Sequence, residues 1–321
     1  MCRSDGPHFE RPINNVMKKL LITGGTGFVG SVIQRSLANP ANPFGLELVP
    51  PQTIELRDPS GLAKLCAETQ PDFVIHLAAQ SFVPQSFANP HETFEINFLG
   101  TLNLLQALKQ NDFKGQLLFV GSGDMYGLVA PESLPVTENF PLKPRNPYAV
   151  SKVAAEALCY QWSQTEGMNI VMARPFNHIG PGQSERFVVS DFARQIVEIK
   201  LGRREVEISV GDLEVTRDFT DVRDVVRAYL LLLQHGKNGE AYNVCSGEES
   251  SIREILEQLM VLAGVRASIK QDSARFRPAE QRRVYGSCDK LCGVSGWRTE
   301  IPLEQSLVDN LNYWEWKLTH G

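Results

Sequence analysis

A tyrosine and a lysine four residues apart are the residues of this chain whose types and spacing best suit acid–base chemistry. Tyr148 and Lys152 lie in the stretch NPYAVSK, where Pro147 suits the first turn of a helix and good helix formers follow. At this spacing the two side chains share one helix face. Because a neighbouring ammonium favours the phenolate, we expect Lys152 to lower the pKa of Tyr148 from its usual value of about 10. Such a pair is suited to proton transfer at neutral pH.

Ser122 is the third candidate for this chemistry. The apolar run LLFV (117–120) predicts a buried strand, and the segment GSGDMYG (121–127) follows it directly. Ligands of α/β sheets bind outside the carboxyl ends of parallel strands. We therefore expect the Ser122 hydroxyl to hydrogen-bond a substrate oxygen. The alternative is a serine that only stabilises its own turn.

A glycine-rich turn near the amino end predicts a dinucleotide site. The run KLLIT (19–23) predicts a strand, and Gly24, Gly27 and Gly30 follow it at intervals of three residues, before helix-forming sequence from Ser31 to Leu37. Glycines at these positions let the backbone approach a pyrophosphate closely, and the amino end of the helix presents free N–H groups to it.

The position that often carries the ribose-binding acid of a dinucleotide site has none here. The second predicted strand, 46–49, is followed by Pro50, Pro51 and Gln52. Asp58 could reach the adenine or could cap the helix that opens at Pro59, and both roles stay open. NADH and NADPH are therefore both candidate cofactors.

The rest of the chain alternates between strand-like and helical segments. This order predicts an α/β fold, a Rossmann-type doubly wound parallel sheet, followed by a smaller C-terminal α/β substrate domain. We place the NAD(P)-binding domain at 17–175 and 219–246, and the substrate domain at 176–218 and 247–321. A helix is expected from about 91 to 110. Residues 1–16, which lack an apolar segment and carry two prolines, are expected to be a disordered tail.

Composition excludes several classes of function. The 321 residues carry a net charge of −5, so no overall positive field attracts nucleic acid or an anionic membrane surface. No run approaches the roughly 18 apolar residues that a membrane helix needs. The six cysteines are scattered, which favours reduced thiols in the cytoplasm. Cys288 and Cys292 lack partners at a zinc-like spacing, so no metal site is expected.

Taken together, these motifs resemble the extended short-chain dehydrogenase/reductases that act on nucleotide sugars. The resemblance runs from Lys18 to about Trp316. It rests on the segments 23–30, 76–81, 174–177 and 217–224, and on Asn97, Ser122, Tyr148 and Lys152. Within that family, the segments 121–127, 145–152, 173–183, 215–219 and 279–284 are most similar to bacterial GDP-6-deoxy-D-lyxo-4-hexulose reductases.

The resemblance implies NADPH- or NADH-dependent reduction of the C4 keto group of GDP-4-keto-6-deoxy-D-mannose, giving GDP-D-rhamnose or its C4 epimer. By this likeness Ser122, Tyr148 and Lys152 are the catalytic residues. The implied cofactor-binding residues are Gly24, Gly27, Phe28, Val29, Gly30, Asp58, Leu77, Ala78, Ala79, Asn97, Tyr148 and Lys152. The implied substrate-binding residues are Ser81, Ser122, Asp124, Asn177, Arg194, Arg217, Arg277 and Glu280.

Three other functions stay open. A 4-epimerase with tightly bound NAD needs only the same three catalytic residues. The related 4,6-dehydratases use an acid–base pair directly after the position of Ser122, where this chain has Gly123 and Asp124. Because glycine cannot carry a proton, dehydration is disfavoured, although Asp124 keeps it open. A non-catalytic dinucleotide sensor is the most remote alternative, since such a protein would be free to lose Tyr148 or Lys152.

Four further features also give expectations. His76 is expected to be a hydrogen-bonded core histidine, and the mid-helix Asn97 to be hydrogen-bonded. The four arginines in 275–283 are interpreted as a phosphate clamp, with a solvated basic loop as the alternative. Relatives pair the helices that carry Asn97 and Tyr148, which predicts a homodimer. The apolar residues of these helices, which fit either that contact or the chain's own sheet, are Leu102, Leu105, Leu108, Leu158 and Trp162.

Overall fold

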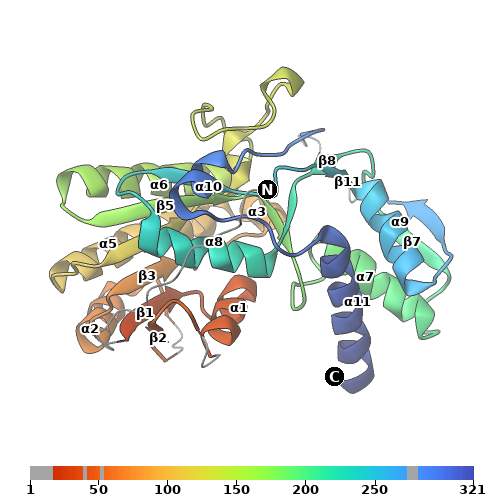
Figure 1. Ribbon diagram of the computed structural model, residues 1–321, viewed down its shortest axis with the longest axis horizontal. Coiled ribbons are helices and arrows are strands. Elements are labelled where there is room, and N and C mark those ends of the chain that lie inside the picture. The colour runs from red at the N-terminus through yellow and green to blue at the C-terminus, as the bar shows by residue number, and fades with distance from the viewer. Residues whose placement is uncertain (1–16, 39–41, 51–53, 273–280) are drawn as a thin grey trace, which may run out of the picture.

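The computed structural model describes residues 17–38, 42–50, 54–272 and 281–321 (Figure 1). The predicted tail at 1–16 lies outside these residues, as do Arg275, Arg277 and Glu280. No helix in the described part of the chain is long and apolar enough to cross a membrane.

Six parallel strands form the central sheet, in the order β10-β5-β4-β3-β1-β2. Their bounds are β1 (Lys18–Thr23), β2 (Leu46–Leu48), β3 (Phe73–His76), β4 (Gln116–Val120), β5 (Asn169–Pro175) and β10 (Ala241–Val244). The strand order reverses beside β1, because β2 lies on one side of it and β3 on the other. Ligands of such sheets bind outside the carboxyl ends of the strands at this reversal. The predicted Rossmann-type sheet is confirmed.

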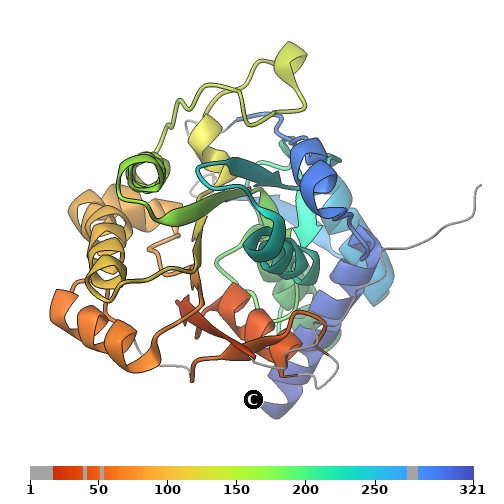
Figure 2. The same cartoon turned by 60° about the vertical axis from the view of Figure 1, so that its left-hand side comes forward.

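Helices cover both faces of this sheet (Figure 2). One face carries α2 (Pro59–Thr69), α5 (Gly100–Gln110) and α6 (Pro147–Thr165), and the other carries α1 (Phe28–Leu37) and α8 (Val222–His235). Along β4, Leu117 and Phe119 pack towards α5 and α6, whereas Leu118 and Val120 pack towards α8. Because both faces are buried, the central strands β1, β3 and β4 consist mostly of consecutive apolar residues.

The turn between β1 and α1 requires glycine at two places. Gly24 has a φ of +75°, and a Cβ atom on it would lie 2.8 Å from the backbone nitrogen of Ala78. A Cβ atom on Gly30 would lie 2.5 and 2.6 Å from the carbonyl oxygens of Gly25 and Gly24. The helix begins at Phe28, three residues earlier than the composition suggests. Glycine therefore allows the first turn of α1 to pack directly on the turn that precedes it.

The single helix expected at 91–110 is three consecutive pieces. The segment consists of α4 (Pro90–Phe94), a π-helical turn (Glu95–Leu99) and α5, after the separate short helix α3 (Val83–Ala88). Asn97 lies in the π-helical turn. Such turns often occur at functional sites, because they redirect side chains that a regular helix would hold elsewhere.

The helices α7 (Val188–Lys200), α9 (Ile252–Ala263) and α11 (Leu303–His320) pack around a second apolar core, beside the sheet in Figure 1. The parallel pair β7 (Glu207–Val210) and β12 (Ser268–Gln271) adjoins these helices. Two further strand pairs, β6 (Asn177–Ile179) with β9 (Phe219–Asp221) and β8 (Thr216–Arg217) with β11 (Ser250–Ser251), connect this region to the sheet. The short helix α10 (Asp289–Ser295) packs against α8 and β10.

The leucine stripe on α5 faces the chain's own sheet. Leu105 and Leu108 are fully buried, Trp162 is 8% exposed, and all three belong to the core between the sheet and its helices. Leu102 and Leu158 pack partly against the same core. Of the two roles that the sequence allowed for these side chains, packing within the chain is the one observed.

We expect Gly30→Ala to lower the free energy of unfolding by about 1–3 kcal/mol, because the new methyl group meets backbone atoms that cannot move aside. The matched control is Gly293→Ala in α10, where a Cβ atom meets nothing within 4 Å. That substitution should raise stability by about 0.5–1 kcal/mol, since alanine favours a helix over glycine. Urea unfolding of both variants measures the difference, and equal stabilities would contradict the packing argument.

Candidate active site

The amino end of α6 holds the tyrosine and the lysine in place. Asn146 caps the helix, and its Oδ1 accepts a hydrogen bond from the backbone nitrogen of Ala149 at 2.7 Å. Pro147 occupies the first helical position, as the sequence predicts. Tyr148 is 9% exposed and Lys152 is 3% exposed, so both side chains lie against the body of the protein.

Lys152 points towards the end of the neighbouring strand. Its Nζ donates a hydrogen bond to the carbonyl oxygen of Val120 at 2.8 Å and lies 5.2 Å from the ring centre of Phe119. Burial lowers the pKa of this ammonium to about 8. The lysine is thus anchored at the carboxyl end of β4.

The pKa of Tyr148 is raised, which corrects the expectation that Lys152 lowers it. Burial is the main cause, and the negative charge of Asp124 adds to it. A hydrogen bond with the Ser122 side chain acts in the opposite direction and is the smaller effect. The ammonium of Lys152 is bound to Val120 and is not among the groups that shift the phenol. Tyr148 is therefore a neutral phenol at neutral pH in the protein alone.

Ser122 both stabilises its own turn and contacts Tyr148. It caps the 3₁₀ turn Gly123–Tyr126, where its Oγ accepts a hydrogen bond from the backbone nitrogen of Asp124 at 3.2 Å. The same side chain is the hydrogen-bond partner of the Tyr148 phenol. The two predicted roles of this serine coexist, and Ser122, Asp124 and Tyr148 meet just beyond β4.

A buried ion pair connects the segments that carry these residues, and sequence reasoning missed it. Nη2 of Arg174, at the end of β5, lies 2.6 Å from Oε1 of Glu156 on α6. Nη1 of Arg174 donates to the hydroxyl of Tyr126 at 2.9 Å, and that hydroxyl donates to Oδ1 of Asn243 at 2.6 Å. Glu156 follows Lys152 by four residues, so an acid on the inner helix face was the signal available in the sequence.

The glycine turn has the form of a cradle for a pyrophosphate. Gly27 is the N-cap residue of α1 and offers no side chain to the first N–H groups of the helix, which stay open to an anion. Close backbone packing at Gly24 and Gly30 leaves no space for a Cβ atom on either residue. These observations fit a dinucleotide phosphate group. Phe28 and Val29 begin the helix directly behind the turn.

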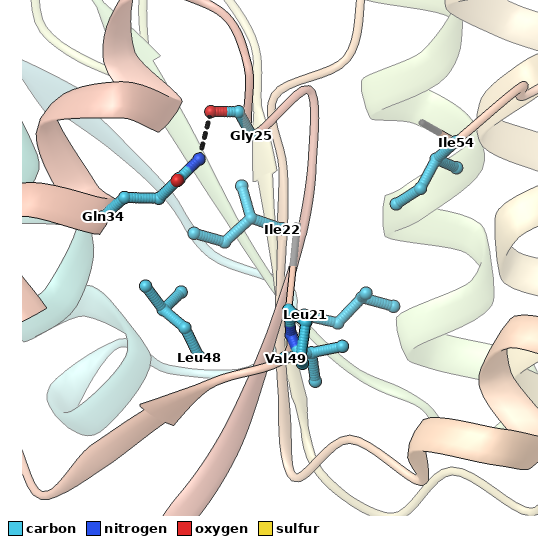
Figure 3. A pocket seen from close by; sticks show the side chains of 8 residues that line it. Leu21, Ile22, Gly25, Gln34, Leu48, Val49 and Ile54 are labelled. Carbon is cyan, nitrogen blue, oxygen red and sulfur yellow. Dashed lines mark hydrogen bonds between the residues drawn. The ribbon is translucent and has the colours of Figure 1, made fainter. Parts of the chain in front are cut away.

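A small recess of about 10 Å³ lies beside this turn (Figure 3). The Gln34 side chain borders it and donates a hydrogen bond to the carbonyl oxygen of Gly25 at 2.6 Å. The other residues of its lining are Leu21, Ile22, Gly25, Leu48, Val49, Pro50 and Ile54. None of these is acidic, in agreement with the lack of a ribose-binding acid after the second strand.

Several predicted cofactor residues have structural partners within the chain. Asp58 caps α2 by accepting a hydrogen bond from the backbone nitrogen of Gly61 at 3.0 Å, so the capping role is observed. Asn97 accepts from the backbone nitrogen of Gln80 and donates to Oγ of Ser151 at 2.9 Å. Both ends of this amide are therefore used to join the loop after β3 to α6. The segment Leu77–Ala79 follows β3 at the carboxyl end of the parallel strands.

His76 is a core histidine, as predicted. Its Nδ1 lies 2.6 Å from Oγ1 of Thr23, and its Nε2 lies 2.9 Å from Oγ1 of Thr101. Burial, together with the charge of Lys152, lowers its pKa to about 3. The neutral ring connects β1, β3 and α5.

Some of the predicted substrate residues are neighbours, whereas Arg194 is held by ion pairs within its own helix. Asn177 is exposed on β6, opposite Phe219 of β9, and Arg217 lies two residues before that partner, so these two candidates are neighbours. Nη1 of Arg217 donates to the carbonyl oxygens of Thr216 and Gln281. Arg194, in contrast, is held on α7 by Asp191 at 3.0 Å and Glu198 at 2.6 Å. Ser81 is exposed in the loop after β3.

The phosphate clamp predicted for 275–283 is not supported by the arginines that the structure describes. Arg282 forms an ion pair with Asp212 at 2.7 Å, and Arg283 forms one with Glu249. Each guanidinium has a carboxylate partner from a distant segment, which the sequence pattern does not reveal. Among the described residues, no group of three or more histidine, cysteine or acidic side chains is arranged to hold a metal ion.

Comparison with known proteins gives consistent matches over nearly the whole chain. The family model described as GDP-mannose 4,6 dehydratase matches residues 51–309. The GDP-6-deoxy-D-mannose reductase of Pseudomonas aeruginosa is 52% identical over 298 residues, covering 93% of this chain and 97% of that protein.

Solved structures agree with this match. The structure of RMD from Pseudomonas aeruginosa complexed with NADPH has a TM-score of 0.88 and 50% identity, covering 94% of this chain and 99% of that one. UDP-glucose 4-epimerase from Thermus thermophilus, in complex with NAD, has a TM-score of 0.82 and 31% identity, covering 92% of this chain and 98% of that one. The fold, the site and these relatives together show that this chain belongs to the extended short-chain dehydrogenase/reductases that act on nucleotide sugars.

Proposed function

We propose that this protein reduces the C4 keto group of GDP-4-keto-6-deoxy-D-mannose, with NADPH as the reductant and GDP-D-rhamnose as the product. The observation that carries the proposal is the neutral Tyr148 phenol hydrogen-bonded to Ser122 at the carboxyl end of β4. The 52% identity to a GDP-6-deoxy-D-mannose reductase supports the choice of substrate.

The residues divide the reaction between them. Bound NADPH would supply the hydride that reduces the carbonyl carbon. Tyr148 donates its phenolic proton to the developing alkoxide at O4, and Ser122 donates a hydrogen bond to the same oxygen. Lys152, whose ammonium donates a hydrogen bond to the carbonyl oxygen of Val120 at the end of β4, holds the cofactor ribose. The turn containing Gly24, Gly27 and Gly30, with the amino end of α1, binds the pyrophosphate.

The proton donor that reduction requires is present in the protein alone. A reductase needs a proton donor, whereas a 4-epimerase begins by removing a proton from the sugar hydroxyl and needs a base. Burial and Asp124 both keep the Tyr148 phenol protonated, so the protein alone presents the donor. The epimerase stays the second candidate, because a UDP-glucose 4-epimerase shares this fold at 31% identity.

Dehydration is disfavoured on packing as well as on chemistry. A Cβ atom on Gly123 would lie 3.2 to 3.4 Å from three ring carbons of Phe176. A second acid at this position would therefore require the Phe176 ring to shift by a few tenths of an ångström. Asp124 alone cannot supply both the proton donor and the proton acceptor that loss of water requires.

The remaining proposals concern the choice of cofactor, the residues that bind the sugar nucleotide and the roles of the two domains. The structure of RMD from Pseudomonas aeruginosa, at 50% identity, is a complex with NADPH, which supports NADPH over NADH. Asn177, Arg217, Asp124 and Ser81 are proposed to bind the sugar nucleotide, together with Arg277 and Glu280. Arg194 is left out, since two carboxylates already bind it. The sheet domain is proposed to hold the cofactor, and the region around α7, α9 and α11 the sugar nucleotide.

The direct test is NADPH oxidation on addition of GDP-4-keto-6-deoxy-D-mannose. We expect one NADPH to be oxidised per keto sugar, and Tyr148→Phe to lower kcat by about 10²- to 10⁴-fold, because the general acid is lost. Tyr160→Phe is the matched control, since Tyr160 lies on the same helix and is 53% exposed. No net oxidation, with NAD retained by the purified protein, would overturn the proposal in favour of the epimerase.

The affinity for NADPH should weaken as pH rises through about 8. The pKa of Lys152 is lowered to about 8, so the ammonium that binds the ribose is present below that pH and is lost above it. Fluorescence titrations with NADPH at a series of pH values measure the effect. Lys152→Met should bind weakly throughout and lack the step near pH 8. An unchanged step in that variant would assign the titration to another group.

We also propose that the protein forms a homodimer through the outer faces of the π-helical turn before α5 and of α6. Leu99 is 46% exposed and Val150 is 39% exposed on these segments, so both side chains are accessible to a partner subunit. Sedimentation should show a species heavier than the 35.8 kDa monomer at micromolar concentration. Replacing both residues by lysine should release monomers, whereas Val261→Lys, at an 80% exposed position on α9, should not. A wild-type protein that sediments only as monomer would refute the dimer.

A further inference from the structure

Three cysteines from distant parts of the sequence meet behind the loop that carries Ser122. Cys245 follows β10 and is fully buried, whereas Cys288 and Cys292, at the start of α10, are only partly buried. The Sγ atoms of Cys288 and Cys292 are 3.5 Å apart. Cys245 also forms a side-chain hydrogen bond with Cys288. The reaction proposed above uses none of these thiols.

The surroundings of Cys288 favour its thiolate. Its pKa is lowered to about 6, chiefly by the hydrogen bond from Cys245, with Cys292 as a further donor and with burial and Asp289 acting against them. Burial and the neighbouring Cys288 raise the pKa of Cys292 to about 11, so this residue stays a thiol at neutral pH. A thiolate with an adjacent thiol is the arrangement of a reactive cysteine and its resolving partner.

We infer that Cys288 and Cys292 form a dithiol that hydrogen peroxide oxidises to a disulfide, and that this oxidation slows turnover by displacing the loop that carries Ser122. The disulfide is independent of the activity of the protein. The effect on turnover rests on the proposed reductase function.

The two steps balance as follows. The Cys288 thiolate attacks one peroxide oxygen, an S–O bond forms, the O–O bond breaks, and the departing hydroxide takes up a proton to become water. The sulfur is thereby oxidised to a sulfenic acid. The Cys292 sulfur then attacks the Cys288 sulfur, an S–S bond forms and the S–O bond breaks. The proton of the Cys292 thiol leaves with the hydroxide as a second water.

This bond requires the backbone at Cys288 to move, because Cβ atoms four residues apart on a helix are about 5–6 Å apart and those of a disulfide about 3.5–4.5 Å. Residues four apart in a helix have Cα atoms about 6 Å apart, inside the range of about 4.4–6.8 Å found for disulfides. The two sulfur atoms must approach from 3.5 Å to about 2.05 Å. Cys288 is the N-cap residue of α10, with φ −99° and ψ 10°, so it lies outside the regular helix. Its movement loosens one backbone hydrogen bond, from the nitrogen of Cys292.

Packing connects Cys288 to the catalytic loop. Cys288 lies against an apolar cluster that contains Tyr126, Phe176 and Cys245. A Cβ atom on Gly286, two residues earlier, would lie 2.7 Å from the Phe176 ring and 2.9 Å from the Cys245 sulfur. The opposite edge of the same ring packs against Gly123, next to Ser122. Because such interiors are close-packed, a shift of the segment before α10 is passed on to that loop.

The test is peroxide titration of the full chain, carrying Cys2→Ser, followed by thiol alkylation and peptide mass mapping. We expect a Cys288–Cys292 disulfide, with the loss of two hydrogen atoms, before Cys66 or Cys159 is modified, since burial raises the pKa of both of these thiols. NADPH turnover should fall several-fold in parallel and recover with dithiothreitol. A disulfide between other cysteines, or none, would overturn the inference.

Two variants separate the steps. Cys292→Ser should keep its turnover in reducing buffer and accumulate a sulfenic acid at Cys288 that dimedone traps, whereas Cys288→Ser should form neither product. A mapped disulfide with unchanged turnover would refute the coupling to the catalytic loop. If the reduced protein fails to oxidise NADPH with the keto sugar, the proposed function fails, while the peptide map still decides whether the dithiol exists.

Discussion

The buried ion pair between Arg174 and Glu156 is the interaction on which the geometry of the site depends. It joins the end of β5 to α6, the helix that carries Tyr148 and Lys152, and through Tyr126 it reaches the turn that carries Ser122. Burying two charges is costly, so such a pair adds specificity of position more than stability. Losing one partner would leave the other charge unpaired, at a cost of about 3–5 kcal/mol. This ion pair therefore joins the segments that carry the three proposed catalytic residues.

Features that depend on local sequence could be predicted. The strand before Gly24, the helix that starts at Pro147 and the loop after β4 follow from apolar runs, glycine spacing and helix caps, which act over a few residues. The core role of His76 was also predictable, because it lies within an apolar run that both faces of the sheet bury. The parallel sheet then brought Ser122 and Tyr148 together, since the carboxyl ends of its strands share one edge.

Features that depend on distant partners could not be predicted. The sequence places Lys152 beside Tyr148 on a helix face, yet its ammonium bonds to Val120, thirty-two residues away. The sequence suggests that Arg282 and Arg283 form a basic patch, but in the fold Asp212 and Glu249 form ion pairs with them. The pKa of a phenol reflects its burial, which no spacing records. The π-helical turn at Asn97 likewise depends on the loop and helix that its amide joins.

Gly123 shows how packing around the site can limit its chemistry. A side chain at that position would press on the Phe176 ring, and that ring has little freedom to move, because Gly286 approaches its far edge and the backbone nitrogen of Phe176 is bonded to Val244 at 2.9 Å. The ring also packs with Tyr126, whose hydroxyl belongs to the network of Arg174. The packing that surrounds the proposed proton donor thus also disfavours a second acid beside it. The tight packing at Gly123 therefore disfavours the acid–base pair that removal of water requires.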